Sequence, residues 1–257
     1  MNEQEIKALQ ALKASKNYQD VCEETVERVF LEQLPKYKKL KDAEKAARTA
    51  LHSITGAFLT PDELARAREA MTAWREGCPE ALFKALSMHS STRERLNGID
   101  GLFDRILTAA GNPESVLDLA CGLNPLYLGA RGGLRMTGAD INIGCVRLIN
   151  ECARENGWNV NAITCDLLSR VPEGEYALTL AMKLFPVLES QKSGFAAALL
   201  ENLRSRTICV TFPTRTLGGR GVGMEKHYSE WFESRVPANR QIEQRFVYAD
   251  ELVYILK

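Results

Sequence analysis

The stretch that decides the fold is SVLDLACGLNPLYLG, residues 115 to 129. An apolar run fills its first half, Gly122 stands in its middle, and Pro125 opens its second half. This order predicts a strand that ends at a glycine turn and restarts as a helix. The free backbone N–H groups of such a helix start favour a nucleotide-like ligand. Dinucleotide-binding turns carry three glycines, however, and this turn carries one.

Downstream of this stretch, apolar runs alternate with helical segments. The candidate strands cover residues 115–119, 134–139, 160–164, 177–182 and 207–212. This alternation predicts parallel strands in a doubly wound α/β sheet. The C-terminal segment QIEQRFVYADELVYILK predicts two antiparallel strands around a turn near Ala249 and Asp250. An antiparallel hairpin that closes a parallel sheet is typical of the class I S-adenosylmethionine-dependent methyltransferase (Rossmann-like) fold.

The part of the chain before residue 115 shows helical patterns and no strand signal. Thr60 and Glu63 predict a capping box at one helix start, and Ser91 and Glu94 predict a second box that opens a helix to about Leu107. We therefore expect a helical domain at 1–80, a connecting helical segment at 81–112 and a methyltransferase domain at 113–257.

Composition is that of a globular protein: 45% of the 257 residues are hydrophobic, 26% are charged and the formal net charge is zero. No apolar stretch approaches the roughly 20 residues that span a bilayer. The polar N-terminus shows no signal-peptide pattern, and seven cysteines without a CxxC pair favour a reducing cytoplasm. Three widely separated histidines argue against a zinc site.

Two segments are locally basic although the whole chain is neutral. Residues 36–48 hold six basic and two acidic side chains, and residues 202–224 hold four arginines and no acid. These segments favour a docking surface for a polyanion. For residues 36–48, a solvated helix face is an equally good interpretation.

Two acids end successive candidate strands, Asp140 in TGAD and Asp166 in ITCD. Ligands of doubly wound sheets lie at the carboxyl ends of the strands. An acid after the second strand suits ribose hydroxyls, and an acid after the third suits the exocyclic amino group of adenine. Together they indicate adenosine without a pyrophosphate, which is the profile of S-adenosylmethionine. The alternative for each acid is a helix N-cap.

Three further features suit such a site. Arg93 lies in the first turn after Ser91, where a guanidinium and free N–H groups would bind the methionine carboxylate; the alternative is a surface arginine. Lys183 ends an apolar strand and needs a partner or a function, unless it reaches out to solvent. The segment VTFPTRTLGGRGVGM (210–224) favours a nucleic-acid backbone or a flipped base, with Phe212 as a stacking surface. A plain surface loop, and core packing of Phe212, are the alternatives.

Several sequence blocks together resemble the aminoglycoside-resistance 16S rRNA (guanine(1405)-N(7))-methyltransferases. They run in order from about residue 48 to the C-terminus: LHSITGAFLTP, LSMHSSTRERL, VLDLACGLNPL, MKLFPVLE, TFPTRTLGGRGVGM and WFE. HSSTRER and FPTRTLGGRG are not general methyltransferase motifs, so the combination is specific.

The resemblance implies S-adenosylmethionine as cofactor, a decoding-site guanine of 16S rRNA in the 30S subunit as substrate, and aminoglycoside resistance as the outcome. It assigns Arg93 to the cofactor carboxylate and Gly122 to the methionine moiety. The other cofactor residues would be Asp140, Asp166, Leu167, Phe58, His89, Ser91 and Gln191. The residues facing RNA would be Arg48 and His52 in the docking domain and Lys183, Phe212, Arg215, Arg220 and Met224 on the catalytic face.

Guanine N7 carries a lone pair and no proton, so direct attack on the sulfonium methyl needs no general base. We therefore expect no catalytic acid or base, no metal and no membrane contact, and a monomeric enzyme. Two alternatives stay open at this point. One is a ribosome-binding assembly factor with a vestigial cofactor pocket, and the other is a methyltransferase that acts on another RNA base.

Overall fold

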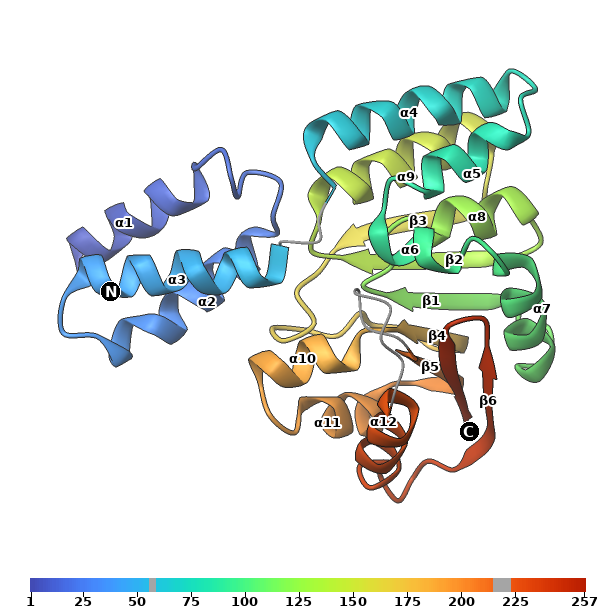
Figure 1. Cartoon of the computed structure of the whole chain (residues 1–257). Helices are drawn as coiled ribbons and strands as arrows, with labels where there is room; N and C mark the ends of the chain where they lie inside the picture. The colour runs from blue at the N-terminus through green and yellow to red at the C-terminus, as the bar shows by residue number, and fades with distance from the viewer. Residues whose placement is uncertain (56–58, 215–222) are drawn as a thin grey trace.

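The computed structural model describes residues 1–55, 59–214 and 223–257, and these residues form a seven-stranded sheet flanked by helices (Figure 1). The strand order is β3-β2-β1-β4-β5-β7-β6. The first five strands pair in parallel, and β7 pairs antiparallel with β5 and β6. The strands are β1 (Ser115–Leu119), β2 (Arg135–Asp140), β3 (Val160–Thr164), β4 (Tyr176–Met182), β5 (Ser205–Pro213), β6 (Ile242–Tyr248) and β7 (Glu251–Leu256).

This sheet confirms the predicted α/β class and the C-terminal hairpin. The five parallel strands begin and end within two residues of the predicted bounds. β1 is buried along its whole length, and the last five residues of β4 are buried as well. Strands covered on both faces read as continuous apolar runs, and this is why the sequence pattern located them.

Two layers of helices cover the two faces of the sheet. One face packs against α4 (Pro61–Arg75), α5 (Glu80–Leu86), α7 (Ile99–Ala109), α8 (Asn124–Arg131) and α9 (Ile143–Asn156). The other face packs against α10 (Phe185–Gln191), α11 (Phe195–Asn202) and α12 (Met224–Glu233). The predicted helix start at Asn124 and Pro125 is confirmed, because α8 begins there directly after the glycine turn.

The N-terminal helices form a separate unit beside the sheet, seen at the left of Figure 1. It consists of α1 (Glu3–Lys13), α2 (Glu23–Gln33), the 3₁₀ turn η1 (Leu34–Lys36) and α3 (Leu40–Thr55). Its own apolar core includes Leu12, Val26, Phe30, Ala47 and Leu51. We call residues 1–55 the helical unit.

The packing divides the chain before α4 rather than at residue 80. The buried face of α4, with Ala67, Ala70 and Met71, belongs to the same core as the sheet. The small alanine side chains of this face let α4 lie close to α9. The capping box of Thr60 and Glu63 at its start is confirmed.

The second predicted capping box is wrong. A short helix, α6 (Ser90–Arg95), begins one residue earlier, and its N-cap His89 makes no side-chain cap bond. The Glu94 side chain instead pairs with Lys183 at 2.5 Å. The helix also does not reach Leu107 without a break, because Gly98, with φ of 153°, separates α6 from α7.

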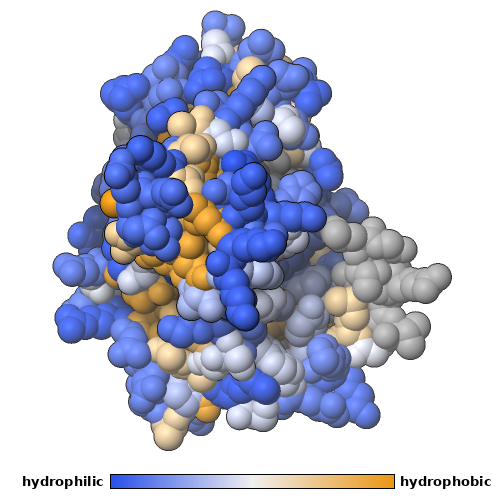
Figure 2. All heavy atoms as spheres, turned by 90° about the vertical axis from the view of Figure 1, so that its left-hand side faces the viewer, coloured by the Kyte–Doolittle hydropathy of each residue, from blue (hydrophilic) through white to orange (hydrophobic). Residues whose placement is uncertain are grey.

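Figure 2 views the molecule from the side of the helical unit. This face is mainly hydrophilic, with a strip of hydrophobic residues near its middle. Among the described residues, no helix combines the length and the apolar character that a membrane span requires.

Candidate functional site

A cavity of about 200 Å³ opens at the carboxyl ends of the parallel strands. This volume is on the scale of a small molecule rather than a nucleic-acid strand. The structure brings seven of the predicted site residues together in its lining: His89, Ser91, Asp140, Asp166, Leu167, Lys183 and Gln191. Arg28 and Ile54 of the helical unit complete the wall on one side.

The backbone bends sharply where the two central strands end at this cavity. Ala120 follows β1 with φ of 52°, and Lys183 follows β4 with φ of 55°. Residues other than glycine rarely adopt a left-handed conformation, which costs about 1–2 kcal/mol. The strand order reverses between β1 and β4, so both strained residues lie at the topological switch point where such sheets bind ligands.

Gly122 is the glycine that the turn after β1 requires. Its φ is 51°, and a Cβ atom there would lie 2.4 Å from Cε1 of His89. Its N–H donates to Oδ2 of Asp140 at 2.8 Å. The single glycine therefore lets the loop approach both the His89 ring and the acid at the tip of β2.

We expect Gly122→Ala to lower the affinity for S-adenosylhomocysteine, the demethylated form of the expected cofactor, by about tenfold or more. The new methyl group must displace the His89 ring from the cavity wall. Calorimetric titration measures the affinity, and thermal unfolding measures the stability.

Gly157→Ala is the matched control for this substitution. Gly157 has a similar φ of 66° at the C-terminus of α9, and a Cβ there meets nothing within 4 Å. Both variants carry a similar backbone strain, but only Gly122→Ala also meets the His89 ring. Equal cofactor affinity in the two variants would contradict the role assigned to Gly122.

Asp140 and Asp166 both point their carboxylates at this end of the sheet, and each is already anchored by backbone donors. Oδ1 of Asp140 accepts the N–H of Asn142 at 2.8 Å, in addition to the bond from Gly122. Burial raises the pKa of Asp140, and these backbone N–H donors oppose the rise. Oδ1 of Asp166 accepts the N–H of Leu168 at 2.9 Å, and Oδ2 accepts Nε of Arg28 at 2.8 Å.

His89 is held as a neutral ring at the cavity. Nδ1 lies 2.9 Å from the Thr92 hydroxyl. Burial, together with the charges of Arg95, Arg93 and Lys183, lowers the pKa of His89 to about 4. The imidazole is therefore uncharged near neutral pH and contributes shape and hydrogen bonding rather than charge.

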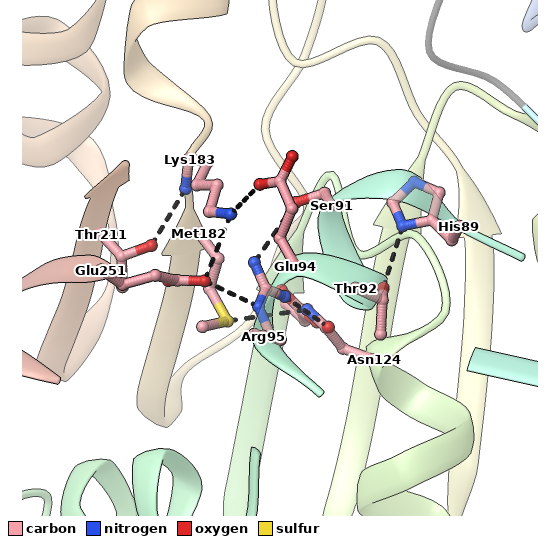
Figure 3. A network of polar contacts seen from close by, with 11 residues as sticks. His89, Ser91, Thr92, Glu94, Arg95, Asn124, Met182, Lys183, Thr211 and Glu251 are labelled. Carbon is pink, nitrogen blue, oxygen red and sulfur yellow. Dashed lines mark hydrogen bonds and ion pairs between the residues drawn. The ribbon is translucent and has the colours of Figure 1, made fainter. Parts of the chain in front are cut away.

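A buried polar network lies below the cavity (Figure 3). Its centre is Arg95, whose Nε donates to Glu251 at 2.9 Å and whose other nitrogens donate to Asn124 at 2.7 Å and to Ser91 at 3.3 Å. Glu251 also lies 3.6 Å from Nζ of Lys183. The side chains of Arg95 and Glu251 are each 2% exposed.

Lys183 thus has two partners, Glu94 and Glu251, and does not reach freely into solvent. Sequence reasoning missed Arg95 and Glu251. One signal was available, since Glu251 opens an otherwise apolar strand, and a charge in that setting needs a buried partner.

The structure does not place Arg93 in the cavity. Its side chain is exposed and donates to the Ser87 carbonyl at 3.3 Å. Arg95, two residues further along α6, contacts the cavity residue Ser91 instead. The two arginines lie about 200° apart around the helix, so one faces solvent when the other faces the core.

Asp118, on β1, lies at the end of the network and gives a testable pH dependence. It accepts Nδ2 of Asn124 at 3.0 Å, and its other oxygen has no partner among the described residues. Burial raises the pKa of Asp118 to about 8, and the Asn124 bond and the Arg95 charge oppose the rise. The folded protein therefore holds this carboxyl protonated at neutral pH.

We expect Asp118→Asn to stabilise the fold, and the gain to grow between about pH 4 and pH 8. In this window the unfolded chain ionises Asp118 and the folded chain does not, so the stability of the unsubstituted protein falls as the pH rises. The neutral amide removes this dependence and retains an acceptor for Asn124. Chemical unfolding at pH 5 and pH 8 measures the difference; a gain that is the same at both values would contradict the protonation state.

The predicted RNA-facing residues lie in several places. Arg48 and His52 are exposed one turn apart on α3. Met224 is half-buried at the start of α12. Three predicted site residues lie outside the described residues: Phe58, Arg215 and Arg220.

Phe212 is not available to a substrate base. It is 0% exposed in the core and packs against Tyr228, Phe232 and Tyr254, with ring centroids 5.0, 5.2 and 6.2 Å away. Phe212 packs on the sheet face that α12 covers, and residues 207–212 of β5 are all buried because helices cover both faces of the sheet. The structure thus places Phe212 in the core and not at the cavity, as the core interpretation expects.

Two arginines of the second basic segment, Arg204 and Arg206, lie among the described residues. Arg204 and Arg206 lie at the beginning of β5, where they line an open groove at the opposite edge of the sheet. β5 has nine residues, so about 30 Å of strand separates its beginning from its other end, at the cavity edge of the sheet. Arg204 and Arg206 therefore do not reach the cavity.

Across residues 1–55, 59–214 and 223–257, no three His, Cys, Asp or Glu side chains gather where they would hold a metal ion.

Comparison with known proteins gives consistent matches. A family model described as Ribosomal RNA methyltransferase (FmrO) matches residues 14–255. A 16S rRNA (guanine(1405)-N(7))-methyltransferase of Serratia marcescens is 43% identical over 250 residues and covers 97% of both chains. One of Micromonospora rosea is 33% identical, over 96% of this chain and 94% of the relative.

Two solved structures match over the whole chain. The 16S rRNA methyltransferase RmtF in complex with S-adenosyl-L-homocysteine has a TM-score of 0.92 and 55% identity, and covers 100% of this chain and 99% of that chain. The 16S rRNA methylase RmtB has a TM-score of 0.89 and 38% identity, with the same coverage.

Proposed function

The chain belongs to the FmrO family of ribosomal RNA methyltransferases, and we propose that it transfers the methyl group of S-adenosylmethionine to N7 of guanine 1405 in 16S rRNA. The observation that carries the proposal is the cavity at the switch point, with an acid at the tip of each of two adjacent strands. The match to relatives with this activity along nearly their full length supports the choice of substrate.

The residues of the cavity fit the cofactor. An ionised carboxylate offers about four lone-pair sites. Backbone N–H groups occupy one site on each oxygen of Asp140, so acceptor capacity remains for ribose hydroxyls. Asp166 accepts one bond on each oxygen, from the N–H of Leu168 and from Arg28, so acceptor capacity remains for the adenine amino group, with Leu167 beside it in the cavity lining.

We assign the methionine carboxylate to the side of the cavity formed by His89 and Ser91. Arg95 is the buried guanidinium beside Ser91. The charge of Arg95 lowers the pKa of His89 more than the charge of Arg93 does. The role first expected for Arg93 therefore passes to Arg95. Arg93→Ala is then expected to leave the affinity for S-adenosylhomocysteine within about twofold.

The chemistry requires positioning rather than proton transfer. When bound, the cofactor supplies an activated methyl group. Guanine N7 has a free lone pair, so the protein must hold the base in line with the methyl group and exclude water. The neutral His89 and the Lys183–Glu94 pair both lie at the cavity, and N7 has no proton that either of them would need to remove.

The helical unit is the proposed docking surface for the 30S subunit. Arg48 and His52 face solvent on α3, and the lysines of the 36–48 segment are exposed around them: Lys36, Lys38, Lys39, Lys41 and Lys45. Phosphate contacts of this kind give affinity and registration without reading sequence. Met224, Arg215 and Arg220 would approach the target from the catalytic face. A monomeric, cytoplasmic enzyme fits this substrate.

Methylation at N7 leaves a positive charge on a decoding-site base that aminoglycosides contact. Cationic drugs are then repelled and obstructed, so cells that express the protein are expected to resist 4,6-disubstituted deoxystreptamines. Minimum inhibitory concentrations with and without expression measure this outcome.

The direct test is transfer of labelled methyl groups from S-adenosylmethionine to purified 30S subunits, followed by nucleoside analysis. We expect 7-methylguanosine and a borohydride- and aniline-sensitive primer-extension stop at guanine 1405. Subunits with adenine at that position are the control and should take up no label. Label on another base would indicate a different RNA methyltransferase, and binding to subunits without cofactor binding would indicate an assembly factor.

A further inference from the structure

Arg28 connects the helical unit directly to the cofactor cavity. It lies on α2, and its side chain is 14% exposed. Nε donates to Oδ2 of Asp166 at 2.8 Å, and a terminal nitrogen donates to Oε1 of Gln191 at 2.9 Å. The other terminal nitrogen pairs with Glu32, one turn along α2, at 3.0 Å. One guanidinium therefore joins the helical unit, the acid after β3 and the end of α10.

A second connection reaches the loop that carries Asp140. The N–H of Cys22 donates to the carbonyl of Ile141 at 2.8 Å, and the N–H of Ile143 donates to the carbonyl of Asp20 at 2.9 Å. The residue between these two bonds, Asn142, donates its N–H to Asp140. The helical unit thus contacts the segments that position both cofactor acids.

The same unit is internally rigid between this contact and its exposed basic face. Val26, Phe30, Ala47 and Leu51 are at most 1% exposed in the core that joins α2 to α3. The Tyr18 hydroxyl donates to the carbonyl of Arg48 at 3.2 Å. A partner that fixes α3 therefore also fixes α2, and with it the Arg28 side chain.

We propose that Arg28 is a positioning residue that couples docking of the ribosomal subunit on the helical unit to cofactor binding, by holding Asp166 and Gln191 in their binding orientation. This inference rests on the proposed function, since it requires the cofactor in the cavity and the subunit on the helical unit. Coupling is reciprocal: if the subunit strengthens cofactor binding by some factor, the cofactor strengthens subunit binding by the same factor.

Comparing the free enzyme with the enzyme docked on the subunit shows whether docking strengthens or weakens cofactor binding. We infer that α2 moves with the helical unit in the free enzyme, so that Asp166 is anchored by a mobile partner. In the docked enzyme, α2 is fixed, and the cofactor finds Asp166 and Gln191 already oriented. We expect saturating 30S subunits to raise the affinity for S-adenosylhomocysteine by about tenfold, within the common range for coupled sites.

The experiment compares the dissociation constant of labelled S-adenosylhomocysteine with and without saturating 30S subunits. Arg28→Ala is expected to weaken cofactor binding to the free enzyme and to reduce the coupling factor to about one. Arg28→Lys should restore part of the coupling, because an ammonium can pair with Asp166 but cannot fork to Gln191 as well. A substitution that only destabilised the fold would lower the cofactor affinity of the free enzyme without reducing the coupling factor to about one.

Arg147→Ala is the matched control. Arg147 pairs with Asp20 at 3.9 Å across the same contact between helical unit and sheet, and both side chains are more exposed than Arg28. It touches neither Asp166 nor Gln191 in any contact of the described residues. This variant should retain the full coupling factor.

The outcomes separate the two proposals. Full coupling in both Arg28 variants overturns the role of Arg28, and so does an unsubstituted enzyme that methylates subunits but shows no coupling; the proposed function survives both results. An unsubstituted enzyme that neither binds S-adenosylhomocysteine nor modifies subunits overturns the proposed function and this inference with it. Thermal unfolding checks that each variant is folded, and Arg28→Lys carries the test where Arg28→Ala does not fold.

Discussion

Asp140→Asn is expected to lower the affinity for S-adenosylhomocysteine by about 100-fold or more. Both carboxylate oxygens of Asp140 accept backbone N–H groups, from Gly122 and from Asn142. An amide has one acceptor oxygen, so one N–H then faces an NH₂ group, and each buried donor left unsatisfied costs about 1–3 kcal/mol. The cofactor's ribose loses an acceptor at the same time.

Calorimetric titration measures this loss, and circular dichroism confirms that the variant is folded. Asp104→Asn is the control, because Asp104 is an exposed partner of Arg131 far from the cavity. Binding to 30S subunits in the absence of cofactor should be retained by both variants. An affinity for Asp140→Asn within about threefold of the unsubstituted protein would rule out the proposed cofactor geometry.

Glu251→Gln is expected to destabilise the protein by about 3–5 kcal/mol, the usual cost of removing one partner of a buried ion pair. Arg95 then remains in the core without its counter-charge. Lys183 also loses one of its two charged partners and keeps only Glu94. A loss of this size lowers the melting temperature by about 10 °C for a chain of this length.

The pH dependence of this loss has a definite sign. Burial raises the pKa of Glu251, but the charges of Arg95 and Lys183 outweigh it and hold the pKa below the usual value of 4.5. The carboxylate therefore contributes its stability above that value, and the contribution disappears as the pH falls through the lower, folded-state pKa. The difference between Glu251→Gln and the unsubstituted protein should shrink in acid.

Differential scanning calorimetry and chemical unfolding measure the effect. Glu243→Gln is the control, since Glu243 forms an exposed pair with Lys257, and exposed pairs contribute about 1 kcal/mol or less. Equal melting temperatures for the two variants would show that Arg95 finds another partner and that the network does not depend on Glu251.

Some residues of the candidate site can be identified from their own sequence segment, and others cannot. Asp140 and Asp166 were identified from the sequence because each directly follows an apolar strand, and parallel strands end at the same edge of the sheet. Arg28 was not identified, because it lies 138 residues before Asp166 and 163 before Gln191. Neither its own segment nor theirs carries a signal of the contact.

Arg93 and Phe212 show a second limit. Arg93 and Arg95 have the same chemistry two positions apart on α6, and the direction in which the helix is turned decides which of them is buried. Phe212 suits either a base-stacking role or a core, and the aromatic residues of α12 and β7 that surround it come from distant segments. Residue type alone therefore does not decide whether an arginine is buried or exposed, or whether a phenylalanine stacks on a base or packs in the core.

The sequence by itself determined the strand–turn–helix at residues 115–129, the parallel strands, the closing hairpin and the two acids at the strand ends. Periodicity and turn chemistry act over a few residues, so a linear reading recovers them. Tertiary structure alone decided the helical unit's contact with the cavity and the burial of Arg95 against Glu251. These depend on which surfaces meet when helices dock on a sheet, and contacts over more than a hundred residues are set by packing of the whole chain.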